Sequence, residues 1–93
     1  MSAVVDFDAD LPWQRAGSVA LRPEPFGALV YHFGTRKLSF LKSRTLLAVV
    51  ESLAEHPTAD AALAAAGVID AQRPAYEKAL ADLARSQMIE CRT

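Results

Sequence analysis

Two short apolar segments separated by a glycine constrain the fold of this chain more than any other feature. Residues 27–33 (GALVYHF) are rich in β-branched and aromatic side chains, and residues 37–41 (KLSFL) form a second segment of this kind. The pair Gly34-Thr35 between them is typical of a tight hairpin turn, in which we expect Gly34 to supply a positive φ. The pattern predicts antiparallel strands over 27–33 and 37–41. Leu38 and Phe40 would share one face of the sheet, with Ser39 and Leu41 on the other.

Further strands flank this hairpin in the sequence. A β-type run over residues 18–22 stops at Pro23-Glu24-Pro25, where two prolines exclude a helix and favour an extended bend. A short closing strand is expected over residues 88–91. The first twelve residues show no clear period, and we expect residues 1–12 to form a mobile arm, with Trp13 as its anchor on the body.

Apolar periodicity and capping residues indicate helices in the second half of the chain. Three helices are expected, over residues 43–55, 58–66 and 71–86. Ser43 and Thr58 are suited to cap the first two helices, because a hydroxyl at this position accepts from an early backbone N–H. Pro57 would end the first helix, and Gly67 is a natural stop for the second.

The order of the elements predicts the fold class. Strands precede helices, which is typical of an α+β fold with a small three-stranded antiparallel sheet and a three-helix bundle on one side of it. Three short helices after a hairpin also fit a winged-helix-like arrangement. The 93 residues suffice for one domain, which we place at residues 13–93.

Composition argues against several classes of protein. One cysteine cannot form an internal disulfide or a cysteine-built metal site, and it fits a reducing compartment. No apolar run approaches the ~20 residues that a membrane span needs, so we expect a cytoplasmic protein without a membrane partner. Of the two histidines, His32 has no carboxylate or cysteine at ligand spacing, and His56 lacks the positioned acid–base partners that catalysis usually needs. We therefore expect no enzyme activity, no catalytic residue, no metal and no cofactor. His32 would be structural or contact a partner, and His56 would lie at a helix C-terminus.

A winged-helix DNA-binding protein is the alternative. The second and third helices could form a helix-turn-helix, but the third carries Glu77 and Asp82 among its bases. Phosphate neutralisation needs a basic face, and the pI of about 6.1 argues against nucleic acid as a partner.

Charge and strand exposure favour an extended peptide as the partner. Residues 14–44 contain six bases and one acid, whereas residues 1–13 and 45–93 are each acidic overall. A three-stranded sheet must leave an edge open, and the strand at 37–41 is flanked by Arg36 and Lys42. This basic edge would attract an acidic peptide that adds a strand to the sheet. The alternatives without a binding function are that Leu38 and Phe40 face the core and that the bases form an ordinary solvated rim.

The third helix would supply the other wall of such a site. Its apolar stripe consists of Tyr76, Ala79, Leu80 and Leu83. These side chains could equally be core, and for Leu80 a core position is at least as well supported. A proline at Leu41 is the substitution expected to abolish peptide binding, by removing a backbone donor from the edge.

The run from Leu21 to Leu41 (LRPEPFGALVYHFGTRKLSFL) closely resembles the peptide chaperones of mycofactocin systems. These belong to the small precursor-recognition domains related to the pyrroloquinoline-quinone peptide chaperone (recognition elements for ribosomally made peptides). The resemblance continues through residues 46–50 (LLAVV) and 65–68 (AAGV) and covers about residues 11–91. Its specific part is the stretch from Tyr31 to Phe40.

The resemblance implies a non-catalytic chaperone with a winged-helix-like fold. Such a chaperone binds the leader region of a precursor peptide and presents it to a radical S-adenosylmethionine maturase, which holds the iron–sulfur cluster. The leader pairs with the third strand and lies against the third helix. Carried onto this sequence, the strand is Lys37, Leu38, Ser39, Phe40 and Leu41. The helix wall is Tyr76, Ala79, Leu80 and Leu83, and the charge contacts are Arg36 and Arg85.

Overall fold

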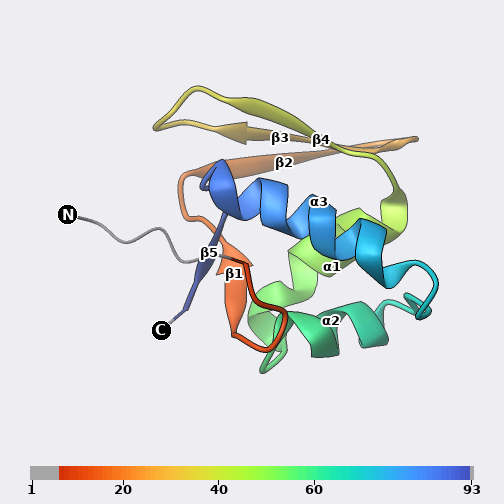
Figure 1. Cartoon of the computed structure of the whole chain (residues 1–93). Coiled ribbons are helices and arrows are strands. Elements are labelled where there is room, and N and C mark those ends of the chain that lie inside the picture. Colours follow the sequence, from red (N-terminus) through yellow and green to blue (C-terminus); the bar gives the residue numbers. More distant parts are fainter. Residues whose placement is uncertain (1–6, 93) are drawn as a thin grey trace.

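The computed structural model describes residues 7–92 as an α+β fold, as expected (Figure 1). Its strands are β1 (Trp13–Arg15), β2 (Val19–Glu24), β3 (Gly27–His32), β4 (Leu38–Leu41) and β5 (Ile89–Cys91). Its helices are α1 (Arg44–Ser52), the 3₁₀ turn η1 (Leu53–Glu55), α2 (Ala59–Ala65) and α3 (Arg73–Arg85). None of the helices in residues 7–92 is both long and apolar enough to cross a membrane.

Strands β2, β3 and β4 form an antiparallel sheet in that order, which confirms the three-stranded sheet. Strand β2 differs from its prediction because it continues through Pro23, which pairs with Ala28, and ends only at Glu24. Proline is tolerated here because β2 is an edge strand, where a missing N–H breaks no ladder bond if it faces outward. Pro25 and Phe26 then form the two-residue turn into β3.

The turn between β3 and β4 is not built as the sequence suggested. Gly34 has no positive φ; the left-handed residue is Arg36, at a φ of 62°. The imidazole of His32 organises the turn, since its Nδ1 accepts from the backbone N–H of Gly34 (3.0 Å) and of Thr35 (3.1 Å). The prediction that Gly34 supplies the positive φ of the turn was wrong. Arg36 has the positive φ, and the His32 side chain accepts the turn's backbone hydrogen bonds. Strand β3 consequently ends at His32, and Phe33 is exposed.

The capping predictions for the helices are confirmed. The hydroxyls of Ser43 and Thr58 accept from the N–H groups of Leu46 and Ala61, both at 3.0 Å. Gly67 follows α2 with a φ of 84°. The helix expected over 43–55 tightens to a 3₁₀ turn in its last three residues.

All three α-helices lie on the same side of the β2–β3–β4 sheet (Figure 1). The sheet's inner face contributes Ala28, Val30 and Leu41 to the core, each no more than 1% exposed. Helix α3 contributes Leu80, which has no exposed surface. Within residues 7–92, no helix packs on the opposite face of the sheet (Figure 1).

Strands β1 and β5 form a second, two-stranded sheet in which Trp13 pairs with Cys91. The closing strand expected at 88–91 is thus present as β5, whereas β1 was not predicted. Arg92, just after β5, donates to the carbonyls of Ala54 (2.7 Å) and His56 at the end of η1. His56 lies at the C-terminus of this helix, as expected, and the cation that binds the carbonyls there is Arg92.

Residues 1–6 of the arm predicted over residues 1–12 lie outside the described residues. Residues 7–12 differ from the prediction. Residues 7–12 contact the body: the backbone carbonyls of Leu11 and Ala9 accept from Ala59 (3.1 Å) and Asp60 (2.9 Å) in α2. The indole N–H of Trp13 donates to the Asp8 carbonyl at 2.8 Å. Trp13 is an anchor, as expected, and the chain preceding it is held against α2.

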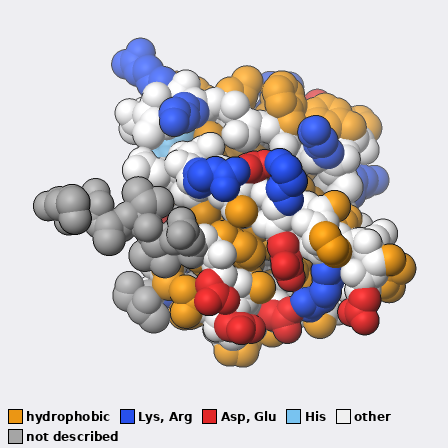
Figure 2. Space-filling view, viewed as in Figure 1, with side chains coloured by type: hydrophobic (Ala, Val, Ile, Leu, Met, Phe, Trp, Pro, Cys, Tyr) orange, Lys and Arg blue, Asp and Glu red, His pale blue; other side chains and the backbone are white. Residues whose placement is uncertain are grey.

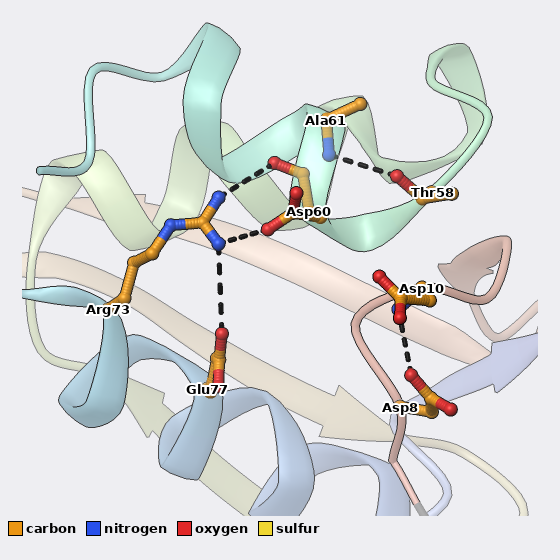
Figure 3. Close-up of polar contacts among 7 residues, drawn as sticks. All are labelled: Asp8, Asp10, Thr58, Asp60, Ala61, Arg73 and Glu77. Atoms are coloured by element: carbon orange, nitrogen blue, oxygen red, sulfur yellow. Dashed lines mark hydrogen bonds and ion pairs between the residues drawn. The ribbon is translucent and has the colours of Figure 1, made fainter. Parts of the chain in front are cut away.

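An ion-pair cluster joins α2 to α3 beside this segment (Figure 3). The guanidinium of Arg73 binds the carboxylate of Asp60 and lies 3.8 Å from that of Glu77. The hydrogen bond to Asp60 and the surrounding carboxylates raise the pKa of Arg73, so the group stays charged at any physiological pH. The cluster fixes the start of α3 relative to α2.

Candidate peptide-binding groove

Strand β4 has one free edge. Among the described residues it pairs with β3 on one side and with no strand on the other. Its register with β3 is set by the pairs Ala28–Leu41, Leu29–Phe40, Val30–Ser39 and Tyr31–Leu38. An edge strand of this kind presents unpaired backbone groups to any extended chain that approaches it.

The register shows which backbone groups these are. Antiparallel pairs alternate between positions that exchange hydrogen bonds and positions that do not. The backbone N–H of His32 donates to the Lys37 carbonyl at 3.0 Å, so this position is bonded. By alternation, Ser39 and Leu41 are bonded to β3, and the N–H and C=O of Leu38 and Phe40 point to the free edge.

A groove of about 670 Å³ lies between this edge and α3. Its β4 side and the start of α1 are lined by Ser39, Phe40, Leu41, Lys42, Ser43 and Leu46. Its α3 side is lined by Ala75, Tyr76, Lys78, Ala79, Asp82, Leu83 and Ser86. The hydroxyls of Ser43 and Tyr76 lie 3.2 Å apart and join the two sides. The groove is therefore an apolar channel with polar groups at its borders, next to free backbone donors and acceptors.

The structure brings together six of the eleven residues expected at this site: Ser39, Phe40, Leu41, Tyr76, Ala79 and Leu83. Arg36 and Lys37 lie in the exposed turn before β4, and Leu38 is 54% exposed on the outer face of the sheet. Arg85 is beyond the lining, bound to Asp82. The placement of Leu80 in the groove wall was wrong, because its side chain is fully buried in the core.

Several lining residues were not predicted from the sequence, including Ala75 and Asp82 on α3 and Ser86 just after it. Together with Ala79 they follow the helical spacing i, i+4, i+7, i+11, so periodicity contained the signal. The prediction followed the most apolar stripe, which is centred on the buried Leu80. The groove lies beside this stripe, where small and polar residues replace large apolar ones.

Charged side chains lie along the α3 border. The Lys78 ammonium is 3.1 Å from the Asp82 carboxylate, which also binds the Arg85 guanidinium. Figure 2 shows basic side chains over α3 and the β3–β4 turn, with acidic ones gathered over the lower half near α2. Four acidic residues, Asp8, Asp10, Asp60 and Glu77, border a separate hollow. The groove thus lies in the basic half of the molecule.

A comparison with protein families identifies the chain. Residues 12–90 match the model of the peptide chaperone MftB family. The chain belongs to this family. The match runs from just before β1 into β5, and it confirms the resemblance to the mycofactocin-system chaperones.

Curated members of the MftB family are similar over nearly the whole chain. The peptide chaperone MftB of Mycolicibacterium smegmatis is 59% identical over 85 residues, which cover 91% of this chain and 83% of that protein. The protein of the same name from Mycobacterium ulcerans is 60% identical over 83 residues (89% and 76%). The one from Mycobacterium tuberculosis is 56% identical over 84 residues (90% and 77%).

Membership in the MftB family makes this chain a peptide chaperone and not an enzyme. No solved structure matches the chain significantly, so the winged-helix-like description stays a prediction.

Proposed function

We propose that this MftB-family chaperone binds the leader region of a ribosomally made precursor peptide by strand addition to β4. It would then deliver the bound peptide to a radical S-adenosylmethionine maturase in mycofactocin biosynthesis. The observation that carries the proposal is the coincidence of a free strand edge with an apolar groove along the same strand. Main-chain bonds would supply affinity, and the groove would supply selectivity.

The backbone groups of Leu38 and Phe40 allow a guest strand to make up to four hydrogen bonds. Each is worth about 0.5–1.5 kcal/mol net, so the ladder would contribute roughly 2–6 kcal/mol. Alternate side chains of the guest would enter the groove against Tyr76, Ala79 and Leu83. Burial of two large apolar side chains there would add about 1.5–3 kcal/mol each, before the cost of ordering the peptide.

The charge around the groove favours an acidic leader. Lys42 and Lys78 line it, and Arg36 and Lys37 precede β4 in the exposed turn. Asp82 is bound by both Lys78 and Arg85, which lessens its repulsion of a carboxylate. An acidic peptide would therefore be attracted to the β4 edge, more strongly at low salt.

The test is a proline at the free edge. Replacing Leu41, as the sequence first suggested, would remove an N–H that bonds to β3 and would disturb the sheet itself. Phe40→Pro instead removes an outward-facing donor, and Phe40→Ala is the matched control for loss of the ring. Fluorescence anisotropy with a labelled leader peptide should show Phe40→Pro binding at least about tenfold more weakly than Phe40→Ala, which corresponds to one lost hydrogen bond.

Circular dichroism would first establish that both variants keep the wild-type fold. Equal leader affinities of the folded Phe40→Pro and Phe40→Ala variants would contradict strand addition at β4. A generic DNA duplex should not bind, because the three cations of α3 are already paired with carboxylates: Lys78 and Arg85 with Asp82, and Arg73 with Asp60 and Glu77. Salt-sensitive binding of duplex DNA would favour the winged-helix DNA-binding alternative.

A further inference from the structure

The outer face of the β2–β3–β4 sheet concentrates the exposed apolar side chains of the molecule. Five large apolar side chains are exposed in the described residues, and four of them belong to this sheet or its turns: Phe26, Phe33, Leu38 and Phe40. Each is at least 50% exposed. Exposed apolar residues scattered singly need no explanation, but a cluster on one face marks an interaction site.

Register and ring contacts place these side chains together. Leu38 and Phe40 pair with Tyr31 and Leu29, so all four point to the face opposite the core. The rings of Phe26 and Phe40 are 6.4 Å apart, and those of Tyr31 and Phe33 are 5.4 Å apart. The result is an aromatic and aliphatic patch, and none of the helices in the described part of the chain covers this face of the sheet (Figure 1).

Basic side chains surround this surface. Arg22 on β2 is 78% exposed, and Arg36, Lys37 and Lys42 flank β4. Glu24, bound to Arg22, is the one acid on these three strands. A second copy packed face to face would bring like charges together at the rim, whereas a partner with carboxylates around an apolar patch would pair with them.

We propose that this outer face is the docking surface for a folded protein that presents an apolar patch rimmed by carboxylates. This inference rests on the proposed function, in which the partner is the maturase that receives the peptide. Phe40 supports this choice because it belongs both to the lining of the groove and to the outer face. A protein docked on the outer face would lie directly beside a peptide added to β4.

Phe33→Glu tests the docking surface without touching the groove. Phe33 is 61% exposed and does not line the groove, and Ile69, also 61% exposed, lies in the connection between α2 and α3. Ile69→Glu is therefore a matched change of an exposed apolar residue to an acid elsewhere. Biolayer interferometry would measure binding of the purified maturase to each variant, both without leader peptide and with an excess of it. We expect Phe33→Glu to weaken maturase binding at least tenfold and Ile69→Glu to leave it within twofold.

Leader affinity and self-association complete the experiment. Leader affinity measured separately should be within twofold of wild type for Phe33→Glu. A failure of wild-type protein to bind the leader would refute the proposed function. The maturase measurement would still show whether the outer face binds the maturase. Wild-type affinity of Phe33→Glu for the maturase would overturn the docking proposal. Sedimentation could instead show that the wild-type protein is a dimer and that Phe33→Glu is a monomer. With maturase affinity unchanged, this result would assign the face to a second copy and would also overturn the docking proposal.

Discussion

Gly27 is the residue at which one added atom decides whether β4 can lie beside β3. A Cβ built there would be 2.0 Å from the carbonyl oxygen of Leu41 and 2.9 Å from the backbone nitrogen of Ser43. Its φ of 153° is also one that side chains rarely adopt. Glycine therefore sets the close approach between the start of β3 and the end of β4.

Gly27→Ala is expected to destabilise the fold by roughly 2–4 kcal/mol, because backbone atoms cannot move aside as a flexible side chain can. Urea unfolding followed by circular dichroism measures this. Gly17→Ala is the control, since no other atom of the described residues lies within 4 Å of a Cβ there, and it should change the free energy of unfolding by less than about 1 kcal/mol. Equal stabilities of the two variants would contradict the assigned contact.

Single residues also show where sequence reading stops. Alternation correctly placed Leu38 and Phe40 on one face of β4 and Ser39 and Leu41 on the other. It does not say which of the two faces packs against the core. That choice depends on where the helices pack, and they cover the face of Leu41. Leu80 was misplaced for the same reason: a stripe on α3 identifies an apolar face but not which of its members the sheet leaves accessible.

At the scale of elements, the turn between β3 and β4 determines how the candidate binding strand starts. His32→Asn keeps an acceptor at nearly the position of Nδ1, whereas His32→Phe removes it. Hydrogen exchange of the Gly34 and Thr35 amides should accelerate about tenfold or more in His32→Phe, since both lose their acceptor. In His32→Asn, protection should be largely retained. Unchanged exchange in His32→Phe would show that the imidazole does not hold the turn.

Local elements were predictable and distant pairings were not. The hydroxyl caps at Ser43 and Thr58 and the stop at Gly67 follow from neighbours within a few residues. Strand β1 has only three residues and becomes a strand by pairing with β5, near the other end of the chain. No pattern within Trp13–Arg15 predicts a strand there. The contacts of residues 7–12 with α2 are equally non-local. Tertiary packing turned an expected arm into a docked segment.

At the scale of the whole molecule, the proposed groove and the proposed docking face share β4, so their ligands should be coupled. A peptide added to β4 would become a fourth strand, and alternate side chains would extend the outer face. We expect leader peptide to increase the affinity of the chaperone for the maturase about five- to 150-fold, with an equal effect of maturase on leader affinity. Isothermal titration in both orders measures this. Affinities that are independent of the other ligand would contradict the coupling.

Amide hydrogen exchange by NMR, with and without saturating leader peptide, tests the central claim most directly. In the free chaperone, Ser39 and Leu41 should already be protected by β3, while Leu38 and Phe40 exchange rapidly. On peptide binding, the amides of Leu38 and Phe40 should become protected, because their N–H groups donate to the guest strand. Saturation by the leader with Leu38 and Phe40 still exchanging as in the free protein would show that the peptide binds without using this edge.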